Sequence, residues 1–253
     1  MAEYVLEASN LSRIYNKDTE NAFEALHPTE VQIEKGDFVA IMGPSGAGKT
    51  TLVMILSLLD KPTTGRIKLD GRPTYDYSEK ELANYRNESL GFISMDLILW
   101  PNLTIEENIA LPMTIAKKNK AEIKARVLEV AKLCGIEQIL KKKPDKCSGG
   151  QRQRAIVCRG IVSNPKFIVA DEPTGNLDSK NSHEVLGLFQ QLNQQGTGVL
   201  LVTHDCQVAS YSTKTIYIED GKISKVLERK DRSQQEYYEE LVELTSDNIE
   251  ELF

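Results

Sequence analysis

Long apolar runs are missing from this sequence, and no stretch approaches the roughly 18 consecutive apolar residues that a membrane-spanning helix requires. The N-terminus, Met-Ala-Glu-Tyr, lacks the basic residues and apolar segment of a secretory leader. We therefore expect the chain to work in the cytosol and to reach a membrane only through a partner.

Zinc-binding cysteine patterns and a basic charge balance are also lacking. Cys134, Cys147, Cys158 and Cys206 form no C-x-x-C pair and have no histidine at a spacing that suits zinc, so we expect reduced thiols. The formal net charge is −6, whereas proteins that bind duplex nucleic acid usually present a basic face. No nucleic-acid partner is expected.

The residues that are present point first to phosphate binding. Segment 43–51 reads G-P-S-G-A-G-K-T-T and lies between the strand-like run 37–42 and the apolar segment 52–59. This G-x-x-x-x-G-K-[ST] pattern between a strand and a helix is typical of a loop whose backbone N–H groups hold a triphosphate. The residues expected to bind the nucleotide here, called the phosphate loop below, are Gly43, Pro44, Ser45, Gly46, Ala47, Gly48, Lys49, Thr50 and Thr51.

Three side chains of the phosphate loop have expected roles of their own. Lys49 would contact the β- and γ-phosphates as a point charge, and the Thr50 hydroxyl would ligate Mg²⁺. Thr51 would donate a hydrogen bond to the α-phosphate. A nucleoside triphosphate and Mg²⁺ are therefore the predicted cofactors.

A second glycine turn follows Cys147 and leads into the apolar segment 155–162. Ser148 is a natural helix cap, and the glycines beside it let an anion approach backbone N–H groups. Alone, such a turn is most often only a flexible connection. Together with a phosphate loop in the same chain, it predicts a second anion-binding element, the signature turn, which consists of Ser148, Gly149, Gly150 and Gln151.

Polar residues follow two apolar strands. Asp171 and Glu172 end the run 167–170, and parallel sheets bind ligands at the carboxyl ends of their strands. Asp171 is therefore expected near Mg²⁺, with water between them, and Glu172 is expected to accept a proton from the attacking water, although a solvated strand end is the alternative. His204 follows the strand 198–202 and is expected at the γ-phosphate, although a lone histidine is usually structural.

Two segments leave alternatives open. Tyr15 is either a tyrosine packed at a strand end or the face on which adenine stacks. Segment 97–100, Leu-Ile-Leu-Trp, either fills the core of a helical subdomain or forms an apolar groove for the helix of another protein.

Two turns are also predicted from their residues. The turn 174–178, which ends at Asp178, is expected to cap a helix at 180–192, and Asp220-Gly221 is expected to supply the positive φ values of a tight hairpin turn.

The order of these patterns predicts an α/β fold. We expect a P-loop NTPase core with a mostly parallel sheet, N-terminal antiparallel strands at 4–8 and 25–33, and an inserted helical subdomain. The expected domains are 1–227, with the helical subdomain at about 78–164, and an acidic helical extension at 228–253 whose apolar face would hold Tyr237, Tyr238, Leu241, Val242 and Leu244.

From about residue 4 to 227 the chain resembles an ATP-binding-cassette (ABC) ATPase. The phosphate loop, the signature turn, the Asp171-Glu172 pair, the turn 176–178 and His204 occur in that family's order. The resemblance implies ATP hydrolysis by a head-to-tail homodimer, in which ATP lies between the phosphate loop of one copy and the signature turn of the other. It also implies that Asp178 belongs to the nucleotide site.

Finer features resemble the branch of lipoprotein-release and macrolide-export ATPases, and the length and acidic tail look most like its bacitracin-type members, which serve antimicrobial-peptide resistance. This implies a separate membrane permease, contacted near Met95 to Trp100, and a location at the cytoplasmic face of the plasma membrane. The alternatives are lipoprotein release, a non-transport envelope or division complex, and a module that binds ATP but scarcely hydrolyses it.

One position departs from the family pattern. A glutamine that contacts Mg²⁺ and the attacking water normally follows the strand at 92–93, where this chain has Met95. A thioether cannot donate a hydrogen bond and is a poor Mg²⁺ ligand. Either Asp96 or water replaces the glutamine, or hydrolysis and coupling are weakened, and we expect Met95→Gln to raise ATP turnover.

Overall fold

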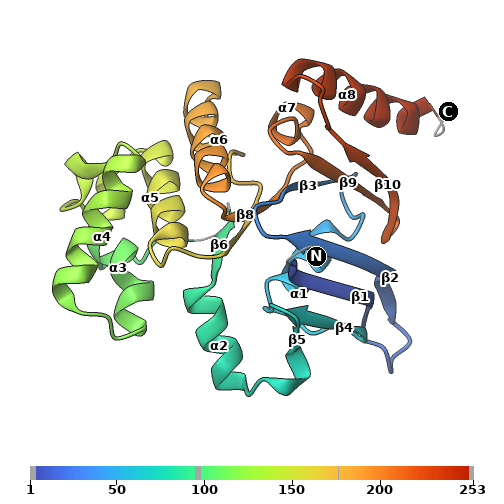
Figure 1. Cartoon of the computed structure of the whole chain (residues 1–253), viewed down its shortest axis with the longest axis horizontal. Helices are drawn as coiled ribbons and strands as arrows, with labels where there is room; N and C mark the ends of the chain where they lie inside the picture. The colour runs from blue at the N-terminus through green and yellow to red at the C-terminus, as the bar shows by residue number, and fades with distance from the viewer. Residues whose placement is uncertain (1–3, 95–97, 176, 251–253) are drawn as a thin grey trace. The chain divides into compact units, whose positions relative to one another are not determined.

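The computed structural model describes residues 4–94, 98–175 and 177–250, and in the last helix the side chains through Ser246. Contacts divide the chain into two compact units, Met1–Asp76 with Gly198–Phe253, and Tyr77–Thr197. Figure 1 labels the helices and strands. The domain boundaries expected from the sequence, at 78–164 and 227, stay predictions.

The first unit contains an antiparallel sheet with the strand order β2-β1-β4-β5. Its strands are β1 (Tyr4–Tyr15), β2 (Phe23–Glu34), β4 (Thr64–Leu69) and β5 (Arg72–Pro73), and a 3₁₀ turn follows at Thr74–Asp76. Strand β1 runs well past the predicted end at Ala8. Asn10 has φ 57°, and the register shifts between Ala8 and Leu11, so an irregularity interrupts the alternation from which the strand was predicted.

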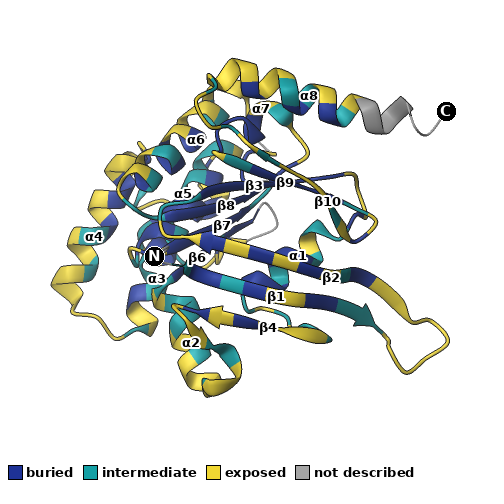
Figure 2. Cartoon of the chain, turned by 45° about the vertical axis from the view of Figure 1, so that its right-hand side comes forward, coloured by how far each residue is buried: buried dark blue, intermediate teal, exposed yellow. Residues whose placement is uncertain are grey.

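The first unit also contains the strands that carry the phosphate loop. Strand β3 (Phe38–Met42) is parallel to β8 (Gly198–Val202) and to β9 (Lys214–Glu219), and β10 (Lys222–Glu228) is antiparallel to β9. Every residue of β3 and β8 is buried, as their continuous apolar sequences predict (Figure 2). Helix α1 (Lys49–Leu56) begins inside the phosphate loop, and the short α7 (Cys206–Ala209) follows β8.

The C-terminal helix α8 (Gln234–Glu250) is packed against this unit. Tyr237, Leu241 and Leu244 are buried with Met42, the residue that precedes the phosphate loop. Their spacing of four and three residues places them on one helix face. Tyr238 was expected on that face but is 39% exposed, because it lies about 100° around the helix from Tyr237.

The second unit is mostly helical, as the sequence predicted for its N-terminal part. Strand β6 is parallel to β7, and α3, α4 and α5 pack on one another. No helix among the described residues is both long enough and apolar enough to cross a bilayer. The elements of this unit are α2 (Glu79–Glu88), β6 (Leu90–Ser94), α3 (Ile105–Ile115), α4 (Lys120–Leu133), 3₁₀ turns at Glu137–Ile139 and Pro144–Lys146, α5 (Gly149–Ile161), β7 (Phe167–Asp171) and α6 (Ser179–Gln194).

Candidate functional site

The phosphate loop is held in place by close backbone contacts that only glycine permits. A Cβ atom on Gly43 would clash with the carbonyl oxygen of Ile218, and one on Gly48 would clash with that of Ala25. Both glycines also have positive φ, at 148° and 95°. The loop is therefore fixed between β2 and the end of β9.

The turn between β9 and β10 braces the same loop from another side. Asp220 and Gly221 both have positive φ, as the Asp-Gly sequence predicted. The N–H of Gly221 donates to the carbonyl oxygen of Ala47 at 3.0 Å, and the carbonyl oxygen of Gly221 accepts from the N–H of His27 at 2.8 Å. The sequence predicted this turn but not its contact with the loop, because the two are more than 170 residues apart.

Lys49 stands at the first position of α1. Its Nζ donates to the carbonyl oxygens of Gly43 and Pro44, each at 2.8 Å, so the ammonium group crosses the opening of the loop. No side chain caps the helix at Gly48. The start of α1 thus combines a cation, a helix N-terminus and exposed glycine backbone at Gly46, which are the features that favour a bound anion.

His204 lies at the same sheet edge as the phosphate loop within the first unit. The preceding residue, Thr203, donates its N–H to the carbonyl oxygen of Ile41 at 3.1 Å, two residues before Gly43. His204 itself is exposed. Its position is compatible with a contact to an anion bound at the loop.

Tyr15 ends β1 and is partly buried. Its hydroxyl donates to Asp60 at 3.1 Å, and the Arg13 guanidinium lies 4.5 Å from the centre of its ring. Arg13 and Asp60 also form an ion pair at 2.9 Å. The sequence indicated the tyrosine but not these two partners.

The signature turn begins α5 with a reciprocal cap. The Ser148 Oγ accepts from the N–H of Gln151 at 3.2 Å, and the Gln151 Oε1 accepts from the N–H of Ser148 at 3.0 Å. A Cβ atom on Gly149 would meet no described atom within 4 Å, and one on Gly150 would only touch Leu177 and Asn181. The cap predicted at Ser148 is present, and Gly149 faces open space.

Asp171 and Glu172 follow β7 in the second unit. Asp171 pairs in register with Ser94 of β6, and both carboxylate residues are partly buried. Glu172 has φ 45°, which is unusual for a residue other than glycine, asparagine or aspartate. The turn that follows is fixed by buried Gln153, whose Nε2 donates to the carbonyl oxygen of Pro173 at 2.9 Å.

Asp178 caps α6, as the sequence predicted. Its carboxylate accepts from the backbone N–H of Asn181 at 2.9 Å and from the Asn181 side-chain amide at 2.6 Å, and these bonds hold its pKa below the usual range. Arg154 on α5 donates in turn to the Asn181 side chain. A chain of hydrogen bonds therefore connects the signature helix to Asp178.

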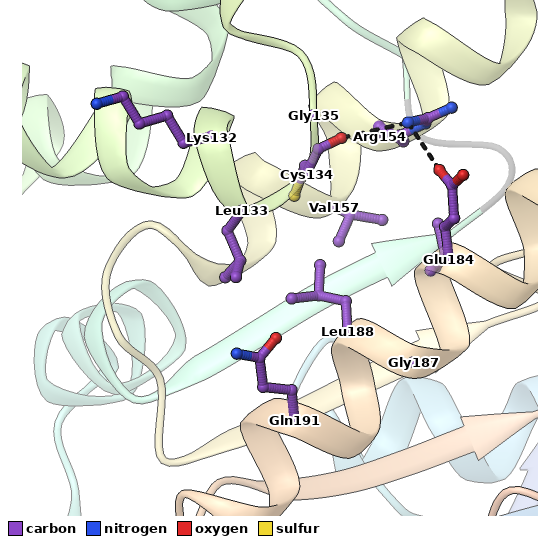
Figure 3. Close-up of a pocket in the computed structure, with 11 residues that line it drawn as sticks. Lys132, Leu133, Cys134, Gly135, Arg154, Val157, Glu184, Gly187, Leu188 and Gln191 are labelled. Carbon is purple, nitrogen blue, oxygen red and sulfur yellow. Dashed lines mark hydrogen bonds and ion pairs between the residues drawn. The ribbon is translucent and has the colours of Figure 1, made fainter.

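Arg154 also borders a pocket of about 360 Å³ between α4, α5 and α6. Figure 3 shows its guanidinium directed toward the Glu184 carboxylate, at 3.0 Å, and toward the carbonyl of Cys134. Leu133, Val157 and Leu188 form much of the apolar lining. None of the predicted site residues lines this pocket, so it is not the predicted nucleotide site.

In the apolar segment 97–100, one described side chain is buried in the core and two are exposed, so each of the two interpretations that the sequence left open fits part of the segment. Met95, Asp96 and Leu97 lie outside the described residues, while Leu99 is buried and thus belongs to the core. Ile98 and Trp100 are 80% and 63% exposed. The buried Asn108 side chain holds the backbone of Trp100 by accepting from its N–H at 2.7 Å and donating to its carbonyl oxygen at 3.1 Å.

No group of three or more histidine, cysteine, aspartate or glutamate side chains among the described residues could hold a metal ion. The four cysteines are free thiols, as expected. Burial raises the pKa of the Cys147 and Cys158 thiols, which keeps them protonated.

A strand, a glycine-rich loop and a helix that begins at Lys49 define a P-loop nucleotide-binding protein. A family model described as "ABC transporter" matches residues 26–175, and the chain belongs to this family. It is the ATP-binding, ATP-hydrolysing subunit of a transporter.

Two relatives show how far the similarity extends. The chain is 42% identical over 239 residues to the bacitracin export ATP-binding protein BceA of Halalkalibacterium halodurans, which covers 94% of each chain. It is 41% identical over 245 residues to the ABC transporter ATP-binding protein YvcR of Bacillus subtilis, covering 96% of this chain and 94% of that protein.

Solved structures confirm the predicted fold class. The dimeric structure of MJ0796, a bacterial ABC transporter cassette, matches 88% of this chain and 98% of its own with a TM-score of 0.83 and 37% identity. A post-hydrolysis state of the same cassette bound to ADP and Pi matches with a TM-score of 0.81 and 36% identity, over 88% of this chain and 98% of its own.

Proposed function

We propose that the chain hydrolyses ATP as a head-to-tail homodimer and thereby drives a separate membrane permease that confers resistance to bacitracin-type antimicrobial peptides. The single observation that carries the peptide assignment is the 42% identity to a bacitracin export ATP-binding protein over 94% of both chains. Neither lipoprotein release nor an envelope or division complex has a comparable observation in its favour.

The proposed nucleotide site uses Lys49, the N–H groups of the phosphate loop, Tyr15 and Asp178. Thr50 and Asp171 supply hydroxyl and carboxylate oxygens, the donors that Mg²⁺ prefers, and Mg²⁺ is usually held by few protein ligands together with the nucleotide phosphates. When bound, Mg²⁺ would neutralise phosphate charge.

Glu172 is proposed to accept the proton of the attacking water, and His204 to hydrogen-bond the γ-phosphate. The positive φ of Glu172 supports a special role, because such strain is retained mainly where a fixed side-chain direction is needed. Catalysis then consists of positioning and charge stabilisation by Lys49 and the loop amides.

The homodimer is supported by the unequal surroundings of the glycines. Gly149 packs against nothing in its own chain among the described residues, so a group from outside the chain has room to approach its backbone. We propose that this group is the γ-phosphate of ATP held by the phosphate loop of a second copy. The similar cassette MJ0796 forms a dimer in its solved structure.

The permease is proposed to contact the segment from Met95 to Trp100, at the cytoplasmic face of the plasma membrane. Ile98 and Trp100 are large apolar side chains that the chain holds in solvent by fixing their backbone: Asn108 binds Trp100, and Arg159 donates to the carbonyl oxygen of Ile98 at 3.2 Å. Fixed and exposed apolar side chains are typical of an interface.

Affinity purification tests this proposal. Tagged Glu172→Gln protein, in which we expect ATP hydrolysis to be blocked, is isolated from detergent-solubilised native cells with ATP and Mg²⁺. We expect a polytopic membrane protein in stoichiometric amount, and loss of it from the matched variant Glu172→Gln/Trp100→Ala. Recovery of soluble partners alone would contradict the transport assignment.

Peptide resistance is tested in a strain that lacks the chain. Wild-type protein should restore growth in bacitracin, whereas equally abundant Glu172→Gln protein should not. If the strains with and without the wild-type chain are equally sensitive to bacitracin, the peptide assignment is wrong. That result would not contradict the assignment of ATPase activity.

A further inference from the structure

We infer that Arg13 and Asp60 are positioning residues that fix the Tyr15 ring as a stacking surface for the nucleotide base, with Arg13 over the face opposite the base. This inference rests on the proposed function, in which Tyr15 contacts the base of ATP. It adds the two residues that would make this tyrosine a preformed site, which the sequence did not indicate.

The Asp60 carboxylate binds both Arg13 and the Tyr15 hydroxyl. Asp60 Oδ1 accepts from the Arg13 guanidinium at 2.9 Å, while Oδ2 accepts from the Tyr15 hydroxyl at 3.1 Å. The guanidinium lies 4.5 Å from the ring centre, which is within the range of a cation–π contact. The Arg13 and Asp60 side chains are each only 23% exposed, so solvent screens this arrangement less than it screens a surface ion pair.

The backbone around these residues is equally constrained. Thr63 Oγ1 accepts from the N–H of Ile14 at 2.9 Å, and the N–H of Thr63 donates to the carbonyl oxygen of Ser12 at 2.8 Å. The segment that carries Asp60 is therefore attached to the end of β1 by backbone bonds as well as by side chains. Loss of one side-chain contact should not unfold this region.

The same elements connect the ring to the phosphate loop. Tyr15 pairs with Phe23 of β2, and two residues further along β2 the carbonyl oxygen of Ala25 lies against Gly48. Asp60 follows the end of α1, the helix that the loop begins. Tyr15, through β2, and Asp60, through α1, are thus both attached to the loop that is proposed to hold the phosphates.

This geometry has a consequence for base binding. Because Arg13 occupies one face of the ring, a base can stack only on the other, and the whole side chain cannot swing to another position without losing its bond to Asp60. A stacking surface that is already fixed loses less entropy on binding. Stacking does not read the edge of a base, so adenine and guanine nucleotides should depend on the arrangement to a similar degree.

Calorimetric titration of the full-length protein with ADP, GDP and pyrophosphate tests the inference, since pyrophosphate occupies the phosphate loop without a base. We expect Tyr15→Ala to weaken ADP binding on the order of tenfold or more. Arg13→Met and Asp60→Asn should weaken ADP and GDP binding by roughly three- to tenfold and leave pyrophosphate binding unchanged. In steady-state hydrolysis these two variants should raise KM for ATP and leave kcat unchanged.

Glu7→Gln is the matched control, because it removes the Lys68–Glu7 ion pair at 3.6 Å between β1 and β4 of the same sheet. Glu7→Gln should alter the affinity for neither the nucleotides nor pyrophosphate. Tyr15→Phe keeps the ring and the Arg13–Asp60 ion pair but loses the hydroxyl bond, so it should weaken ADP binding no more than Asp60→Asn does and leave pyrophosphate binding unchanged. Thermal melts of every variant exclude unfolding as the cause.

The outcomes separate this inference from the proposed function. Unchanged ADP binding by Tyr15→Ala would mean that the base does not stack on Tyr15, which contradicts the proposed site itself. Weakened binding by Tyr15→Ala with wild-type affinity in Arg13→Met and Asp60→Asn would overturn only the positioning inference. An equal loss of ADP and pyrophosphate affinity would also overturn it, because the effect would then act through the phosphate loop.

Discussion

The chain has two glycine turns at helix N-termini, and they are built in opposite ways. In the phosphate loop, Gly43 and Gly48 press against backbone oxygens of β9 and β2, and no side chain caps the helix that follows. In the signature turn, Ser148 and Gln151 cap the helix themselves, and Gly149 meets open space.

The difference shows which glycines the fold of one chain requires. Gly43 and Gly48 are needed for the chain to fold around its own loop, whether or not a nucleotide binds, whereas Gly46 has no such contact among the described residues. A side chain at Gly149 would contact none of the described residues, so a group from outside the chain has room to approach this glycine. This is the physical reason to assign one turn to the chain's own nucleotide and the other to a nucleotide held by a partner.

The largest effect is expected from Gly43→Ala. The added methyl group would clash with the carbonyl oxygen of Ile218 at a backbone φ of 148°, which should cost on the order of 3 kcal/mol of unfolding free energy or more. Urea unfolding measures this cost. A variant as stable as the wild type would show that the loop is not fixed as described.

Gly149→Asp should have the opposite profile. The new side chain has room, and a carboxylate at a helix N-terminus is favourable, so stability should be unchanged or slightly higher. ATP turnover should fall about 100-fold, because the carboxylate would repel the γ-phosphate at the proposed interface. A variant that is less stable than the wild type, or that hydrolyses ATP at the wild-type rate, would contradict the proposed difference between the two glycine turns.

Ser148→Ala should have a moderate effect, since it removes the cap of α5 and should cost about 1 kcal/mol. Urea unfolding again provides the measurement. Ser148→Thr is the matched control and should retain most of the stability. If alanine and threonine are equivalent, the cap does not stabilise the turn.

Asn181→Ala should have the smallest effect. It removes a hydrogen bond that lowers the pKa of Asp178, so the pKa should rise toward its ordinary value near 3.9. Because the folded pKa is depressed, this contribution to stability is present above that value and is lost as the pH falls below it. The stability difference from wild type should thus be constant at neutral pH and shrink below about pH 4. For Asn193→Ala, on the same helix, the difference should not depend on pH.

The comparison also shows what the sequence could predict. The phosphate loop, the Ser148 cap, the Asp178 cap and the buried strands β3, β7 and β8 follow from local patterns, and the structure contains them. Turn and capping preferences act within a few residues, so a sequence reveals them directly.

Contacts between distant segments could not be predicted in this way. The Asp220-Gly221 turn was predicted, but its bond to Ala47 depends on how β9 pairs with β3. Likewise, the sequence indicated Tyr15 but not its contacts with Arg13 and Asp60, because Asp60 reaches Tyr15 only through the path that the chain takes after α1. The exposure of Tyr238 is set by the helix face that α8 buries against Met42.

The most direct test of the central claim is the mass of the Glu172→Gln protein in solution with ATP and Mg²⁺, measured by light scattering with and without the additional change Gly149→Asp. We expect a dimer for Glu172→Gln, and a folded monomer that still binds ATP for the double variant. A double variant that remains dimeric, or a monomer that no longer binds ATP, would contradict the assignment of the signature turn to the nucleotide of a partner.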